Sequence, residues 1–275
     1  MRLLRRAVAG DGYKTVVRPG AAGLRYLSFG VARLEGGKRW ACRTGREEAV
    51  LVILGGRCDV SCGERSWHNL GQRENVFGGR ATAVYVPPAR SFSVQGVGEA
   101  EIAVCRSAAE DGGGEALAGQ AYVVGPDEVE SRIVGARNWR RRVEDIVGGN
   151  RTAKRLLVGE TYNEPGAWSS YPPHKHDVNA PPDEVKMEEV YHFRVNPRNG
   201  FGIQRIYTAD GEIEEVYAVR DGDTVIIPRG YHPVAAAPGY AVYYLWMLAG
   251  DERKMRPRDD PQHSWVKELE KAADA

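Results

Sequence analysis

The chain has 275 residues, of which 42% are hydrophobic, and this suffices for one large or two ordinary globular domains with real cores. Its 38 Lys and Arg residues nearly balance 37 Asp and Glu residues, so the net charge of +1 gives no field that would draw it to nucleic acid. The longest apolar runs, residues 49–54 and 240–250, fall short of the roughly 20 residues that span a bilayer, so we expect a cytoplasmic protein with no membrane partner.

In the first half of the chain, two segments have the short apolar bursts typical of strands. They are AVLVILGGRCDV (49–60) and TAVYVPPARSFSV (82–94), with turns expected at Gly55-Gly56 and Pro87-Pro88. All four cysteines lie in this half, and their spacing matches neither a redox motif nor a zinc ribbon, so we expect reduced thiols. Residues 107–120 (SAAEDGGGEALAGQ) lose the apolar periodicity and form a candidate linker.

The second half is a succession of short predicted strands separated by turn residues, at 155–162, 188–195, 201–208, 214–220, 223–228 and 240–248. Only residues 136–147 and 264–275 predict helices, the latter because their apolar positions recur every three or four residues. We therefore predict an all-β chain with few short helices. Its first domain would span 1–106, the linker 107–120, the second domain 121–250 and a helical tail 251–275.

The two halves resemble each other, which indicates a duplicated barrel. Glu47-Glu48 and Glu188-Glu189 each precede an apolar strand, and each half has a later strand that ends in a proline turn. Aligning Pro87 with Pro228 places Ser91 opposite His232. The first half has no counterpart of the histidines described next, so we predict that it lacks metal ligands and serves in packing.

A histidine pair in the segment YPPHKHD is the strongest candidate for chemistry. In a strand, residues two apart point to one face, so His174 and His176 would share a space. Glu189 could add a carboxylate and His232, after the turn in PRGYH, a third imidazole. Such a set suits one divalent transition metal (Zn, Mn, Fe, Co or Ni) with one or two positions left open. The alternative, a solvated proline-rich loop, is weakened because four of the six histidines fall between residues 174 and 232.

The combination of Gly166, the histidine pair, Glu189 and GDTVIIPRGYH (222–232) resembles the paired cupin motifs, although the gap before Glu189 is longer than usual. SYPPHKHD, EEVYHFR, GFGIQRIYT, GYHPVAAAPGYAVYYL and DDPQHSWV are similar to the two-cupin family of 5-deoxy-glucuronate isomerases. The likeness extends to LGQRENVF (70–77) and AVYVP (83–87) in the first half. It implies two cupin-type β-barrels, a bicupin, in one chain.

The resemblance also implies a reaction and a ligand set. The reaction is an aldose–ketose isomerisation of a small sugar acid, from 5-deoxy-D-glucuronate to 5-dehydro-2-deoxy-D-gluconate in myo-inositol catabolism. The metal ligands would be His174, His176, Glu189 and His232.

Strand alternation sorts the remaining candidates. Tyr191 shares a face with Glu189, whereas Glu188 and His192 point the other way, to the outer face. Of the adjacent Gln204 and Arg205 only one can face the site, and an inward arginine could hold the substrate carboxylate. Trp246, where relatives usually carry Asn, would fill space if it faced inward. The candidate catalytic residues are Tyr191, Gln204, Arg205 and Tyr231, and the candidate substrate-binding residues are Arg205, Arg229 and Trp246. We interpret WRRR (139–142) as the solvated face of a helix rather than a second anion site.

Three other functions compete with the isomerase. They are a ketol-isomerase acting on the 5-keto-4-deoxyuronate of pectin breakdown, an iron-dependent cupin dioxygenase, and a non-enzymatic sugar-acid binding protein. Assembly into a homo-oligomer remains open.

Overall fold

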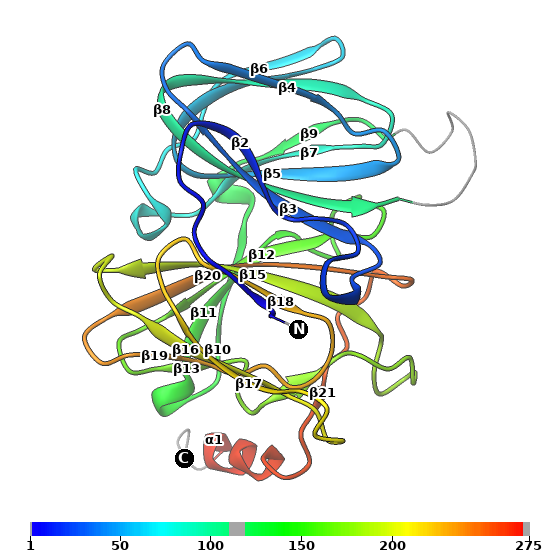
Figure 1. Ribbon diagram of the computed structural model, residues 1–275, viewed down its shortest axis with the longest axis vertical. Helices are drawn as coiled ribbons and strands as arrows, with labels where there is room; N and C mark the ends of the chain where they lie inside the picture. The colour runs from blue at the N-terminus through cyan, green and yellow to red at the C-terminus, as the bar shows by residue number, and fades with distance from the viewer. Residues whose placement is uncertain (1, 110–118, 272–275) are drawn as a thin grey trace.

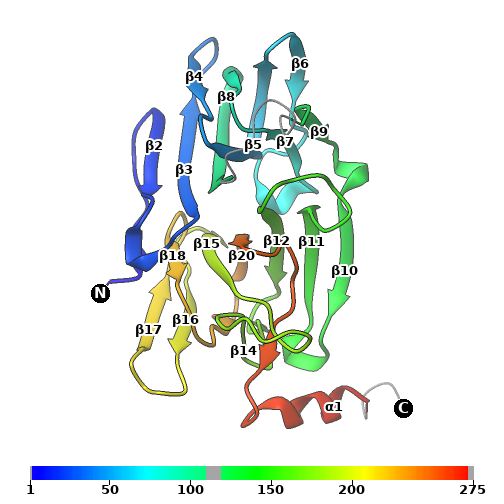
Figure 2. The same cartoon turned by 90° about the vertical axis from the view of Figure 1, so that its right-hand side faces the viewer.

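Two β-barrels stack along the long axis of the molecule (Figure 1). The computed structural model describes residues 2–109 and 119–271, and strands form nearly all of its regular structure, so the all-β prediction is confirmed. In Figure 2 the first half of the chain lies above the second. Within the described part of the chain, no helix has the length and apolar character needed to cross a bilayer.

The first barrel is built on a sheet with the strand order β2-β3-β8-β5-β7-β9, to which β4 and β6 are added by pairing with β8 and β5. Its strands are β2 (Gly12–Val17), β3 (Leu27–Leu34), β4 (Arg39–Arg43), β5 (Glu47–Cys62), β6 (Arg65–Leu70), β7 (Thr82–Val86), β8 (Ser91–Ala108) and β9 (Tyr122–Val124). The turn predicted at Gly55-Gly56 is wrong, because β5 continues through it with two register shifts. Gly56 has a φ of 79°, and an added Cβ would lie 1.9 Å from the carbonyl oxygen of Glu99, so the bend requires glycine there.

Apolar side chains fill the interior of the first barrel. They come from alternate positions of several strands and include Ala49, Leu51, Ile53, Val84, Val86, Val94 and Ile102. This composition fits a structural role for the first barrel.

The second barrel consists of two facing sheets. The larger has the order β1-β18-β15-β20-β12-β11-β10 and the smaller β13-β19-β16-β17, while β14 pairs with β21 at one end. The strands are β1 (Leu4–Arg5), β10 (Glu130–Val134), β11 (Arg141–Val147), β12 (Leu157–Asn163), β13 (Trp168–Ser169), β14 (His174–Lys175), β15 (Met187–Asn196), β16 (Gly202–Tyr207), β17 (Glu214–Val219), β18 (Thr224–Ile227), β19 (Val234–Ala236), β20 (Ala241–Gly250) and β21 (Arg258–Asp259).

The helix predicted over 136–147 is wrong. A short 3-10 helix at Arg137–Trp139 leads into β11, which is paired on both sides, by β10 and β12. Three of its seven residues are β-branched, and pairing with two neighbours outweighs a weak helical pattern. At the C-terminus, a 3-10 helix (Ser264–Lys267) and α1 (Glu268–Lys271) confirm the start of the predicted helix 264–275, whose last four residues lie outside the described part. Further 3-10 helices lie at Ala21–Gly23, Val76–Gly78 and Pro126–Glu128.

Each barrel receives a strand from the other side of the predicted boundary. β1 pairs with β18 of the second barrel, and β9 pairs with β7 of the first. The division into domains at 1–106 and 121–250 stays a prediction. The two strand pairings just described cross its boundary. Most of the predicted linker, residues 110–118, lies outside the described residues.

The larger sheet of the second barrel has no solvent face along its central strands. One side lines the second barrel, and the other packs on the first barrel, where Phe29 lies 5.1 Å from the ring of His192. On the same side, the guanidinium of Arg73 donates two hydrogen bonds to the buried carboxylate of Glu160, at 2.6 and 3.0 Å. A charged or polar side chain on the central strands is therefore largely shielded from solvent on either side of the sheet and needs a partner.

Two carboxylates at the contact between the barrels, one from each barrel, accept backbone hydrogen bonds from the opposite barrel. Glu188 on β15 accepts from the N–H groups of residues 25–27, at 2.5 to 2.7 Å. Glu48 on β5 accepts from the N–H groups of residues 154–156, at 2.6 to 2.7 Å. The two contacts are reciprocal, so we call them the carboxylate clasp between the barrels.

The strand registers show which residues of the two barrels correspond. Ala49 pairs with Val86, directly before Pro87, and Glu189 pairs with Ile227, directly before Pro228. Glu48 therefore corresponds to Glu188, and Ala49 to Glu189. The predicted alignment of Glu47-Glu48 with Glu188-Glu189 is thus shifted by one residue, and the first barrel has a methyl group where the second has its inward carboxylate.

We predict that Glu48→Gln lowers the free energy of unfolding by about 2 to 4 kcal/mol, because an amide nitrogen would face buried N–H donors. Glu188→Gln should cost less, about 1 to 2 kcal/mol, because its donors are only partly buried. Denaturant unfolding would measure the loss. Glu214→Gln, which removes a surface ion pair with Arg205, is the matched control and should change stability by less than about 1 kcal/mol. Unchanged transitions for both clasp variants would contradict this account.

Candidate metal centre

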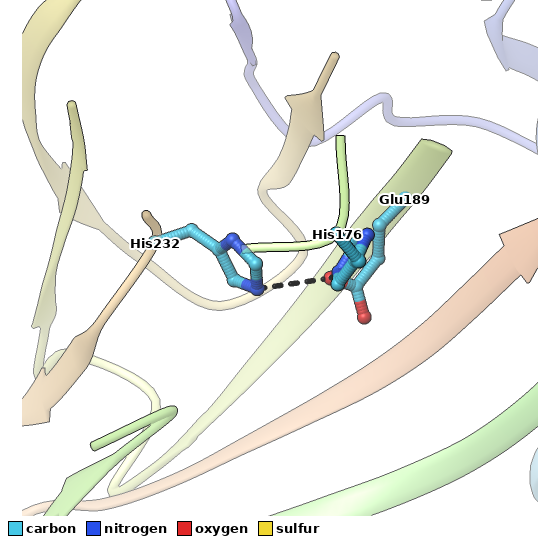
Figure 3. Close-up of side chains that lie close together, drawn as sticks. All are labelled: His176, Glu189 and His232. Carbon is cyan, nitrogen blue, oxygen red and sulfur yellow. Dashed lines mark hydrogen bonds and ion pairs between the residues drawn. The ribbon is translucent and has the colours of Figure 1, made fainter. Parts of the chain in front are cut away.

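Three buried side chains converge inside the second barrel (Figure 3). They are His176, directly after β14, Glu189 on β15, and His232, after the turn that follows β18. Their ligand atoms all lie within 4.8 Å of one another. Glu189 Oε2 lies 3.1 Å from His176 Nε2 and 3.2 Å from His232 Nε2. Two buried imidazoles and one buried carboxylate are the donor set of a divalent transition-metal site.

Backbone carbonyls orient both imidazoles. His176 Nδ1 donates to the carbonyl oxygen of Met187 at 2.8 Å, and His232 Nδ1 donates to that of Gly230 at 2.9 Å. Because a carbonyl only accepts, the hydrogen lies on Nδ1 and Nε2 of both rings is directed at the centre. His232 Nε2 is buried without a hydrogen bond of its own, as expected of an atom that a metal would satisfy.

His174, predicted as a ligand, lies beside this group rather than within it. Its ring centroid is 4.9 Å from that of His232 and 6.3 Å from that of His176. Burial and the neighbouring imidazoles lower the pKa of His174 well below its usual value, so the ring is neutral at pH 7. A neutral imidazole has the free lone pair that a metal ligand requires.

The centre keeps Glu189 ionised. Burial alone would raise the pKa of this carboxyl, but hydrogen bonds and positive charge from His176 and His232, present when their rings are protonated, outweigh burial and lower the pKa to about 2. Burial and the charge of Glu189 in turn raise the pKa of Tyr191 well above its usual value, so its phenol stays protonated. The pocket therefore contains a carboxylate that can bind a cation and a phenol that can donate a hydrogen bond.

Polar side chains that the sequence did not single out surround Tyr191. Its ring stacks on Tyr244 at 4.3 Å, and its hydroxyl lies 3.1 Å from Ser170 Oγ. The hydroxyl of Tyr244 donates to Ser169 Oγ at 2.9 Å, and so does the amide of Asn163. Alternation along YYLWML could have indicated that Tyr244 faces inward, but nothing in the sequence linked the two serines to it.

Gln204, of the adjacent pair on β16, is the residue that faces the interior. It is fully buried, it lies opposite Val234, two residues after His232, and neither its carbonyl nor its amino group has a hydrogen-bond partner. Arg205 points outward and forms a salt bridge with Glu214 at 2.8 Å. The structure therefore does not bring Arg205 to the site.

Two further predicted residues also lie away from the centre. Arg229 pairs with Asp210 at 2.9 Å and with Glu212. Tyr231 packs on Tyr207, with ring centroids 5.0 Å apart.

Trp246 lies on the inner face of the larger sheet, directly across from Tyr191. Its ring covers Gly159, where an added Cβ would lie 2.2 Å from the indole. Trp246 therefore fills space at the barrel wall, as expected for an inward tryptophan.

Comparison with known proteins agrees with this geometry. The model of the KduI/IolB family matches residues 3–266. The chain belongs to the KduI/IolB family. Its relatives include the 5-deoxy-glucuronate isomerase of Geobacillus thermodenitrificans, 39% identical over 264 residues (96% of this chain, 94% of the relative), and that of Bacillus subtilis, 36% identical over 247 residues (89% of each).

Solved structures place this KduI/IolB chain among the cupin-type barrels. An IolB-like protein from Salmonella typhimurium superposes with a TM-score of 0.91 at 34% identity, covering 97% of this chain and 100% of the other. A variant of Bacillus subtilis oxalate decarboxylase shares the fold alone, with a TM-score of 0.60 at 14% identity over 98% of this chain and 82% of the other. The bicupin fold expected from the sequence is thus confirmed.

The neighbouring carboxylates of β15 give a direct test of the centre. Glu189→Gln should weaken metal retention by roughly 10- to 100-fold or more, because it removes an anionic ligand. Glu188→Gln should retain metal, because its side chain faces the first barrel, although the loss of the clasp should lower its stability. Elemental analysis of both purified variants measures the difference, and metal loss from Glu188→Gln alone would contradict the assignment.

Ser91 tests the role of the first barrel. It aligns with His232, but its side chain is exposed, and the interior of the first barrel is apolar. We expect Ser91→Ala to keep isomerase turnover within a few-fold of the parent. A loss of several orders of magnitude in a folded variant would show that the first barrel takes part in catalysis.

Proposed function

We propose that this protein is a metal-dependent aldose–ketose isomerase that converts 5-deoxy-D-glucuronate to 5-dehydro-2-deoxy-D-gluconate in inositol catabolism. The observation that carries the proposal is the near full-length similarity to curated relatives named 5-deoxy-glucuronate isomerase, together with the buried His176, Glu189 and His232. A cytoplasmic location would suit such a step and the four free cysteines.

The proposed cofactor is one divalent transition metal per chain, held by His176, Glu189 and His232 with His174 as the fourth ligand. Zn, Mn, Fe, Co and Ni all accept such donors. When bound, the metal would polarise the substrate carbonyl and make the hydrogen on the adjacent carbon more acidic.

The isomerisation moves a proton between C2 and C1 and a hydrogen between two oxygens, and side chains of this chain must assist both transfers. Tyr191 stays protonated, so we assign it hydrogen-bond donation to a substrate oxygen rather than the abstraction of a proton. Gln204 has an unbonded donor and an unbonded acceptor facing the pocket, and a substrate hydroxyl could satisfy both. Tyr191 and Gln204 are buried, and burial strengthens such contacts.

The test is an isomerase assay with 5-deoxy-D-glucuronate before and after removal of the metal. We expect chelator treatment to abolish ketose formation and the return of one divalent metal to restore it. A metal-free protein with full activity would refute the metal requirement. Faster turnover of the 5-keto-4-deoxyuronate of pectin breakdown, or oxygen consumption, would assign the site to one of the competing reactions.

A further inference from the structure

A sugar acid presents two ends to its enzyme, a carbonyl that reacts and a carboxylate that does not. A buried carboxylate needs a cationic partner, and arginine offers two parallel donors in a fixed geometry. The two arginines expected to serve, Arg205 and Arg229, are engaged by carboxylates of surface loops and strands. Neither guanidinium lies at the candidate metal centre.

Arg141 is the first residue of β11 and pairs with Asn163 of β12. Asn163 belongs to the inner face, where its amide donates to Ser169 Oγ at 2.9 Å. Residues directly opposite each other on neighbouring strands share a face, so Arg141 is directed to the barrel interior. Its neighbour Arg142 points the other way and lies 4.0 Å above the ring of Tyr162, on the side of the first barrel.

Two backbone carbonyls hold the guanidinium of Arg141 next to the segment that leads to the metal centre. Its Nη1 donates to the carbonyl oxygens of Tyr171 at 3.1 Å and Trp139 at 3.2 Å. Tyr171 follows Ser170, which contacts the hydroxyl of Tyr191, and precedes His174 by three residues. The side chain is thus fixed in advance, which reduces the entropy lost on binding a ligand.

The electrostatics agree with this placement. Burial raises the pKa of Tyr244, and the positive charge of Arg141 is among the influences that act to lower it. Arg141 therefore lies within electrostatic reach of the tyrosine pair beside the candidate metal centre.

We propose that Arg141 binds the carboxylate of the sugar acid while the reacting end lies at His176, Glu189 and His232. The inference rests on the proposed function, because it assumes a sugar-acid substrate. It makes Arg141 the residue that selects acids over neutral sugars of the same size.

The test is a binding measurement that needs no turnover. Calorimetry on the zinc-loaded protein compares D-glucuronate with D-glucuronamide, which replaces the carboxylate by a neutral group of similar size. We expect the parent to prefer the acid and Arg141→Gln to weaken D-glucuronate binding about 10- to 100-fold while D-glucuronamide binding and metal content stay unchanged. Arg141→Lys keeps the positive charge but not the two parallel N–H donors of the guanidinium, so it should retain part of the preference for D-glucuronate. Arg142→Gln, on the opposite face of the same strand, is the matched control and should bind both ligands as the parent does.

Three results would overturn the proposal. They are a parent protein that does not distinguish the two ligands, an Arg141→Gln variant that binds D-glucuronate normally, and an equal loss for both ligands, which would indicate that Arg141 only supports the segment at Tyr171. If Arg141→Gln does not fold, a full preference in Arg141→Lys overturns the requirement for the two parallel donors. A parent with no isomerase activity would refute the proposed function instead, and the binding preference would still decide the role of Arg141.

Discussion

Alternation of side chains along β15 is the constraint on which the rest of the structure depends. Successive residues of a strand point to opposite sides of the sheet, and here each side is covered by a different barrel. Glu189 therefore points into the second barrel, where two imidazoles surround it, and Glu188 points to the first barrel, where three N–H groups bind it. A shift of one residue would place each carboxylate among the wrong partners, so the register of this strand fixes the candidate metal centre and the contact between barrels at once.

The two barrels show what one scaffold does with and without that inward carboxylate. Glu48 repeats the contact of Glu188 from the opposite side, so both copies retain the residue that joins them. Ala49 replaces the inward glutamate, and the first barrel is packed with apolar side chains around it. An apolar interior can be filled to high density, whereas a reactive one must keep polar groups and space for a substrate. The first barrel is thus suited to packing, and the second contains the polar groups that chemistry requires.

Much of this could be predicted from the sequence, because it depends on local patterns. Alternation identified the strands and the outward direction of Glu188, and the spacing of His174 and His176 indicated the centre. The predictions that were wrong concern residues whose surroundings are set by neighbours distant in sequence. Glu188 was assigned to the outer face of its barrel, and only the packing of the two barrels shows that this face meets the first barrel and half-buries its carboxylate. Arg141 was assigned to a solvated helix, because the residues of the segment alone do not reveal that it pairs with β10 and β12.

The most direct test of the central claim is anomalous diffraction from crystals of the metal-loaded protein, recorded at the absorption edge of the bound metal. We expect one peak per chain in the second barrel, about 2.0 to 2.2 Å from Nε2 of His176, Nε2 of His232 and a carboxylate oxygen of Glu189. A peak in the first barrel, at its cysteines or between the barrels, with none beside Glu189, would contradict it.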